Sequence, residues 1–158
     1  MFQVRKSKLL VKCPDPQLAF KVEYNRNTFG ITQLSLMMLR DTLAEHINHT
    51  LVVVEVPTSD LVCGFLILDY TIQEAIFTGD GFRSDRGGEG GAAYRAASAL
   101  FAIYGIDPIL WDVIDILPAG PALDKQLLNV AREVAAEGYS AVIPLQQAPA
   151  YIDHCIAK

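Results

Sequence analysis

The residues best suited to chemistry lie in a glycine-rich segment from Thr78 to Gly91. This segment holds six of the chain's 11 glycines, and three arginines lie in it or just beyond it. Each glycine costs extra backbone entropy to order, so such a concentration indicates either unusual dihedral angles or mobility. A loop that leads into a helix directs backbone N–H groups at one point, and guanidinium groups bind phosphate oxygens in pairs.

These features predict a small-molecule-binding domain that senses, stores or sequesters an anionic ligand, either a nucleotide or another phosphorylated compound. The predicted ligand-binding residues are Thr78, Gly79, Asp80, Gly81, Arg83, Ser84, Asp85, Arg86, Gly87, Gly88, Glu89, Gly90, Gly91 and Arg95. The same segment is also compatible with a structural loop or with a contact between subunits, and these alternatives stay open.

The class of nucleotide is not indicated by any motif. Residues 88–93 match G-x-G-x-x-A, but some nine residues separate Thr78 from the first glycine of that match, whereas the dinucleotide fingerprint follows its strand almost directly. A phosphate-binding P-loop would need a lysine, and this segment contains none.

Three carboxylates in the same segment allow an enzymatic alternative. Asp80, Asp85 and Glu89 are residues of the type that hold Mg²⁺ or Mn²⁺ against substrate phosphates in a metal-assisted phosphohydrolase or transferase. Solvated ion pairs with the arginines explain the same acids without catalysis. The sequence identifies neither catalytic residues nor a cofactor, and it leaves open whether the ligand is transformed.

Other chemically capable residues carry weaker signals. His46 and His49 lie three apart near a predicted helix end, but a metal needs more ligands, and capping of the helix terminus explains them. His154 and Cys155 are further ligand types whose position in space the sequence does not give. We predict no metal site. Cys63 lies in an apolar run, which predicts a buried thiol rather than a nucleophile.

Acidic and aromatic residues elsewhere have structural explanations. Asp112 and Asp115 lie in a strand-like segment, where either could receive a ribose hydroxyl or protect an exposed edge strand. Each of four aromatic residues fits a core or interface position as well as a stacking site: Trp111, Tyr70, Tyr94 and Tyr104.

The elements that would position these residues form a mixed-sheet α/β or α+β domain with about three packed helices. Hairpins are expected in the N-terminal half and a βαβαβ order in the C-terminal half. The continuous apolar run 61–68 predicts a central strand buried on both faces. The expected strands cover 2–12, 18–24, 51–56, 61–71, 74–78, 109–117 and 140–145, and the first two form an opening hairpin. The expected helices run from Thr32 to Ile47, with Thr32 as N-cap, from Ala92 to Tyr104 and from Pro121 to Glu137.

Composition limits the class of protein further. The 158 residues are 51% hydrophobic and 20% charged, which predicts one globular domain over 1–158. No run approaches the length of a membrane span and no signal peptide is expected, so we predict a cytoplasmic protein without membrane partners. A pI of 5.1 makes a nucleic-acid partner unlikely on electrostatic grounds. The apolar excess favours a homo-oligomer.

Overall fold

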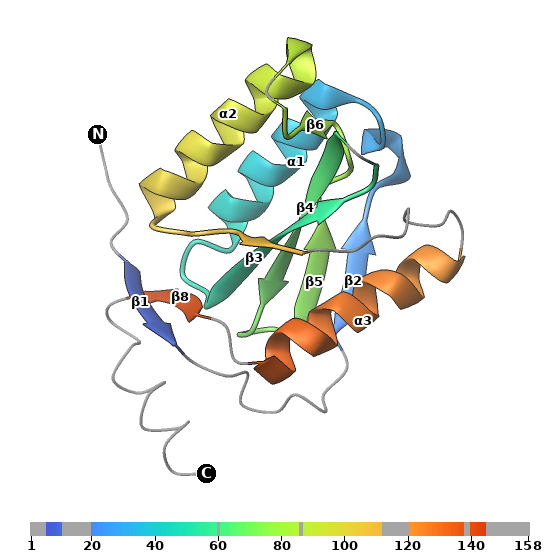
Figure 1. The fold of residues 1–158 in the computed structure, drawn as a ribbon. Helices are drawn as coiled ribbons and strands as arrows, with labels where there is room; N and C mark the ends of the chain where they lie inside the picture. Colours follow the sequence, from blue (N-terminus) through green and yellow to red (C-terminus); the bar gives the residue numbers. More distant parts are fainter. Residues whose placement is uncertain are drawn as a thin grey trace, which may run out of the picture.

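A mixed β-sheet forms the centre of the computed structural model, which describes residues 6–10, 20–59, 61–85, 87–111, 121–137 and 140–144 (Figure 1). The strands follow the order β1-β8-β3-β4-β5-β2, with β6 added to β4 and β7 added to β3. The strands are β1 (Lys6–Leu10), β2 (Lys21–Tyr24), β3 (Leu51–Pro57), β4 (Val62–Asp69), β5 (Glu74–Phe77), β6 (Phe82–Arg83), β7 (Ile109–Leu110) and β8 (Ser140–Pro144). The helices are η1 (Arg26–Thr28), α1 (Thr32–Glu45), α2 (Gly88–Tyr104) and α3 (Pro121–Glu137), and the predicted mixed-sheet α+β class is confirmed.

Antiparallel hairpins build the middle of the sheet. β3 pairs with β4 along its whole length, from Leu51 opposite Asp69 to Pro57 opposite Cys63, and β4 pairs with β5. From Cys63 onward every residue of β4 is buried, which confirms the predicted central strand. Helices cover both of its faces, and this explains why the strand is apolar without alternation.

The outer strands correct one expectation about the N-terminal half. β1 pairs with β8, and β2 runs parallel to β5, so the first two strands do not form the predicted opening hairpin. The local turn residues at 14–17 suggested a hairpin, but pairing over long sequence distances determines the partners. In the C-terminal half, β7 is parallel to β3, whereas β8 is antiparallel to β1 and β3.

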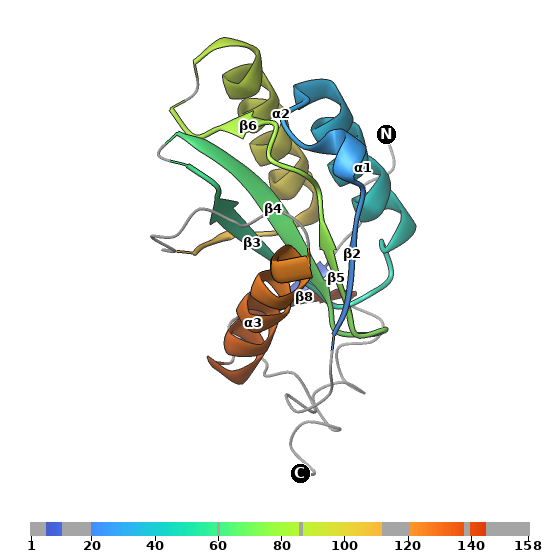
Figure 2. The same ribbon diagram turned by 90° about the vertical axis from the view of Figure 1, so that its right-hand side faces the viewer.

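The two faces of the sheet carry separate cores (Figures 1 and 2). On one face, Val52, Val54 and Leu66 pack with α3, whose buried residues repeat at helical spacing. On the other face, Phe65 and alternate residues of β3 pack against α1 and α2, which lie side by side. Since successive strand residues point to opposite faces, Val52, Val54 and Val56 of β3 join the first core, whereas Leu51 and Val53 join the second.

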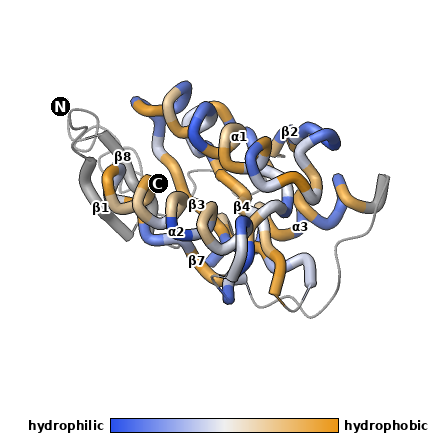
Figure 3. The backbone as a smooth tube through the Cα atoms, turned by 90° about the horizontal axis from the view of Figure 1, so that it is seen from above, coloured by the Kyte–Doolittle hydropathy of each residue, from blue (hydrophilic) through white to orange (hydrophobic). Residues whose placement is uncertain are grey.

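Helix boundaries differ from the sequence prediction at three places, one of which is the end of α1 at Glu45 rather than at Ile47. The N-cap of α1 is Ile31, and Thr32 lies inside the helix, where its hydroxyl donates to the carbonyl of Gly81 at 2.9 Å. α2 begins at Gly88 rather than Ala92, so its first turn includes the last glycines of the segment. It ends, as predicted, at Tyr104, and Gly105 follows as the C-cap with a left-handed φ of 72°. Hydrophobic residues are interspersed with hydrophilic ones along both helices (Figure 3).

Among the described residues, no helix combines the length and apolar character that crossing a bilayer requires.

Candidate functional site

Close packing against α1 accounts for two glycines of the glycine-rich segment. A Cβ on Gly79 would lie 2.4 Å from Thr28 Oγ1, and one on Gly81 would lie 2.7 Å from Ser35 Oγ. Ser35 Oγ accepts a hydrogen bond from the Gly81 N–H at 3.1 Å and donates to the carbonyl of Thr28 at 2.9 Å. The segment is thus held against the start of α1. A larger residue at position 79 or 81 would push the segment away from this helix.

The charged residues of this segment bind one another and nearby backbone. Arg83 forms two hydrogen bonds with the Asp85 carboxylate, at 3.0 and 2.6 Å. These bonds, together with the N–H of Gly87, lower the pKa of Asp85 below its ordinary value. Asp80 accepts hydrogen bonds from the Gly30 N–H at 2.7 Å and from the Thr58 hydroxyl at 3.2 Å.

The predicted site residues therefore lie together along the chain but face different partners. Thr78 is buried and accepts from the N–H of Phe65, while Glu89 and Arg95 are exposed on α2. In the described part of the chain, Asp80, Asp85 and Glu89 do not bring their carboxylates together as a group of metal ligands. Arg86, Asp112 and Asp115 lie outside the described residues. The anionic-ligand hypothesis remains a prediction.

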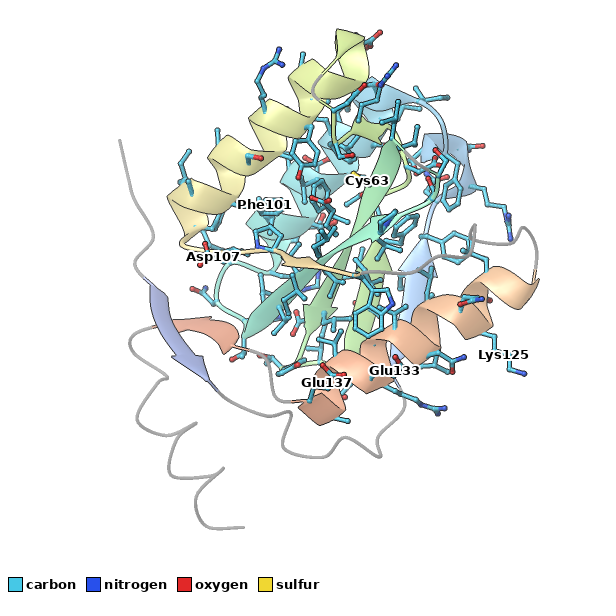
Figure 4. All side chains as sticks on the ribbon, in the orientation of Figure 1. Cys63, Phe101, Asp107, Lys125, Glu133 and Glu137 are labelled. Carbon is cyan, nitrogen blue, oxygen red and sulfur yellow. The ribbon has the colours of Figure 1, made fainter. Side chains whose placement is uncertain are left out.

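A pocket under α2 gathers a second set of polar and aromatic side chains. Its volume is about 370 Å³, and it lies between β3, β4, α2 and the segment that leads into β7. Phe101 on α2 and Asp107 beyond the helix both line it, and Figure 4 labels both near the C-terminal end of α2. Tyr94, Ser98, Phe101 and Ala102 reach it together because their spacing places them on one stripe of the helix.

Glu55 is the buried acid of this pocket. It follows Leu51 and Val53 on the face of β3 that packs against α1 and α2, a position where an apolar side chain would join the core. Its exposed fraction is only 9%, and its carboxylate accepts a hydrogen bond from the Tyr94 hydroxyl. Phe65 lies opposite it on β4 and contacts the rings of both Tyr94 and Phe101.

The charged residues that line the pocket among the described residues are acidic. Glu55 and Asp107 both line it, and none of the described side chains in its wall is basic. Cys63 lies on the same face of β4 as Phe65. Burial is the main cause that raises the pKa of its thiol to about 12, and the negative charge of Glu55 is the second cause. Cys63 is thus a buried, protonated thiol, in agreement with the sequence prediction.

His46 and His49 converge on a third residue that the sequence analysis did not single out. Both imidazole Nδ1 atoms lie 2.5 Å from Oδ2 of Asp69, the last residue of β4. Asp69 is completely buried. The helix end therefore supplies two imidazoles and the strand end supplies a carboxylate.

Both missed acids carry a recognisable signal. Glu55 interrupts an otherwise apolar run in 51–56, and Asp69 ends the run that starts at Leu61. A single charged residue at an inward position of a buried strand needs a partner, because burying an unpaired carboxylate is costly. The partners Tyr94 and His46 come from other elements, so only the fold identifies them.

Comparisons with protein-family models, with curated proteins and with solved structures found no match.

Proposed function

We propose that this protein is a small-molecule-binding domain whose ligand carries a positively charged group on an apolar body. The ligand enters the pocket under α2, and its ammonium or related cation binds Glu55. The buried carboxylate of Glu55 in an aromatic wall, without a basic neighbour among the described residues, is the observation that carries this proposal.

The charge balance of the pocket supports a cationic ligand. Tyr94 donates a hydrogen bond to Glu55 but brings no positive charge to the pocket. Asp107 adds a second acid to the wall. A pocket lined by charge of one sign raises the local concentration of the opposite ion.

The shape and lining of the pocket support an apolar body of small size. A volume of about 370 Å³ falls at the lower end of the roughly 300–1,000 Å³ found for ligand pockets. Phe65 and Phe101 provide aromatic surface, with ring centroids 5.0 Å apart in an edge-to-face arrangement. Aromatic faces also attract cations, so the same walls stabilise both ends of such a ligand.

Three probes that share a phenyl ring test the sign of the charge. Phenethylammonium, phenethyl alcohol and 3-phenylpropionate are titrated into the full chain by calorimetry. We expect saturable binding of the ammonium compound, weaker binding of the alcohol and none of the carboxylate. Equal binding of all three, or preference for the carboxylate, would overturn the proposal.

Glu55→Gln identifies the residue responsible. A hydrogen bond between charged groups is worth about 1.5–3 kcal/mol, so the variant should bind phenethylammonium about 10- to 100-fold more weakly. Glu133→Gln is the matched control, because Glu133 is exposed on α3, on the opposite face of the sheet (Figure 4). Unchanged affinity in Glu55→Gln would show that the probe binds elsewhere.

Calorimetric titration also tests the hypothesis that residues 78–91 bind a phosphorylated ligand. Inorganic phosphate and a nucleotide are added as separate probes, and Arg83→Ala is compared with the original chain. Loss of phosphate binding in Arg83→Ala would support an anion site there, independently of the pocket under α2.

A further inference from the structure

The cluster of His46, His49 and Asp69 has the composition of a metal site. One ligand atom from each residue lies within 4.8 Å of the others. His46 follows α1 as its C-cap, with its N–H bound to the carbonyl of Thr42 at 3.1 Å, and His49 lies in the turn that follows. The end of a helix and the end of a strand therefore meet at one point.

The carboxylate of Asp69 is held in a fixed orientation. Its Oδ1 accepts hydrogen bonds from the backbone N–H groups of Thr71 at 2.9 Å and Ile72 at 3.2 Å. Its Oδ2 is thereby directed at both imidazoles. Partners that orient a ligating side chain are characteristic of metal sites, because they reduce the entropy lost on binding.

The two turns that carry the ligands are attached to each other. The N–H of Thr50 donates to the Thr71 hydroxyl at 3.0 Å, and the N–H of Tyr70 donates to the carbonyl of Thr50 at 2.9 Å. These bonds connect the histidine turn with the turn after Asp69. The three ligands thus belong to one ordered unit.

The donor set selects the type of ion. We propose that His46 Nδ1, His49 Nδ1 and Asp69 Oδ2 bind a divalent transition-metal ion of the Zn²⁺ class. Two imidazole nitrogens and one carboxylate oxygen suit Zn²⁺, whereas Mg²⁺ and Ca²⁺ prefer oxygen ligands alone. The side chain of His49 is 29% exposed, so water reaches the site and can complete a tetrahedral coordination.

The charge of the site agrees with this assignment. In the described part of the chain, Asp69 forms no ion pair with a lysine or arginine. The side chains in contact with its carboxylate are the imidazoles of His46 and His49. A divalent ion bound here would offset the charge of the buried carboxylate. The site is independent of the pocket proposed above, because Asp69 pairs with Leu51, four residues along β3 from Glu55.

Metal titration of the full chain tests the proposal. After treatment with a chelator, the protein is titrated with Co²⁺, whose visible spectrum reports tetrahedral coordination, and the Co²⁺ is then displaced with Zn²⁺. We expect one ion per chain. In a long-range ¹H–¹⁵N spectrum, Zn²⁺ should shift the Nδ1 resonances of His46 and His49, a readout that needs no variant.

Two variants and a control complete the experiment. His49→Gln removes one ligand, and Asp69→Asn retains an oxygen that can accept the two backbone N–H groups. Since loss of partners that merely orient a ligand costs about 10- to 100-fold in affinity, loss of a ligand should cost at least about tenfold. Asp41→Asn, an exposed carboxylate on α1, should bind as the original chain does.

Several results would overturn the proposal. Absence of saturable Co²⁺ and Zn²⁺ binding would leave a hydrogen-bonded cluster of two histidines and an aspartate. Binding that leaves both Nδ1 resonances unmoved, or that is unchanged in folded His49→Gln and Asp69→Asn, would place the ion elsewhere.

Discussion

Replacing Gly79 with alanine tests whether close packing against neighbouring residues requires a glycine at this position of the glycine-rich segment. Gly79 has a φ of +97°, and an added Cβ would lie 2.4 Å from Thr28 Oγ1 and 3.0 Å from Ser35 Oγ. These neighbours cannot easily move, because Thr28 Oγ1 donates to the carbonyl of Asn25 at 2.6 Å and Ser35 Oγ donates to that of Thr28 at 2.9 Å. The variant should therefore suffer both backbone strain and overpacking.

The expected loss of stability follows from these two effects. A left-handed backbone costs an alanine about 1–2 kcal/mol, and overpacking adds about 1–3 kcal/mol. The free energy of unfolding should fall by about 2–5 kcal/mol, measured by urea denaturation. For a chain of this size, each kcal/mol corresponds to about 2–4 °C in Tm, so Tm should fall by roughly 4–20 °C.

Gly88→Ala is the matched control for this measurement. Gly88 also has a positive φ, +63°, but an added Cβ meets no atom within 4 Å. This variant should lose only the strain of about 1–2 kcal/mol. If Gly79→Ala were no less stable than Gly88→Ala, the packing explanation of the segment would be refuted.

Three further outcomes are expected. Because the pKa of Cys63 is raised to about 12, iodoacetamide at pH 8 should modify its peptide only after unfolding, as mass spectrometry would show; rapid modification of the folded protein would contradict its burial. Tyr94→Phe removes the hydrogen bond to the Glu55 carboxylate and should cost about 1.5–3 kcal/mol in urea denaturation, whereas an unchanged midpoint would argue against that bond. Asp85 has a pKa lowered by Arg83, so the pair stabilises the fold above the ordinary pKa of Asp85 and loses its effect as pH falls through the lowered value. The stability difference between the original chain and Arg83→Ala should therefore shrink on acidification, and a difference that grows instead would contradict this sign.

The sequence predicts the elements of the fold better than their pairing. Helical spacing places Leu123, Leu127, Ala131 and Val134 of α3 inward, and all four are buried. The partners of β1 and β2 were not predictable, since their pairing joins segments distant in the chain. Local turn residues contain no information about such partners.

The candidate sites, too, were predictable only where their residues are close together in the sequence. The glycine-rich segment was noticed because its residues are contiguous, and two of its glycines pack against α1. Glu55 and Asp69 each stand alone in an apolar strand, and the residues that give them chemical meaning come from α2 and from the end of α1. A site assembled from several elements becomes visible only when the register of the sheet is known.

The most direct measurement of the central proposal is an amide-shift titration of the ¹⁵N-labelled chain with phenethylammonium. We expect saturable shifts for the amides of Glu55, Tyr94 and Phe101, which line the pocket. Amides of the glycine-rich segment should remain unmoved. Saturable shifts confined to residues outside the pocket, or no shifts at all, would contradict the proposal that this pocket binds a cation.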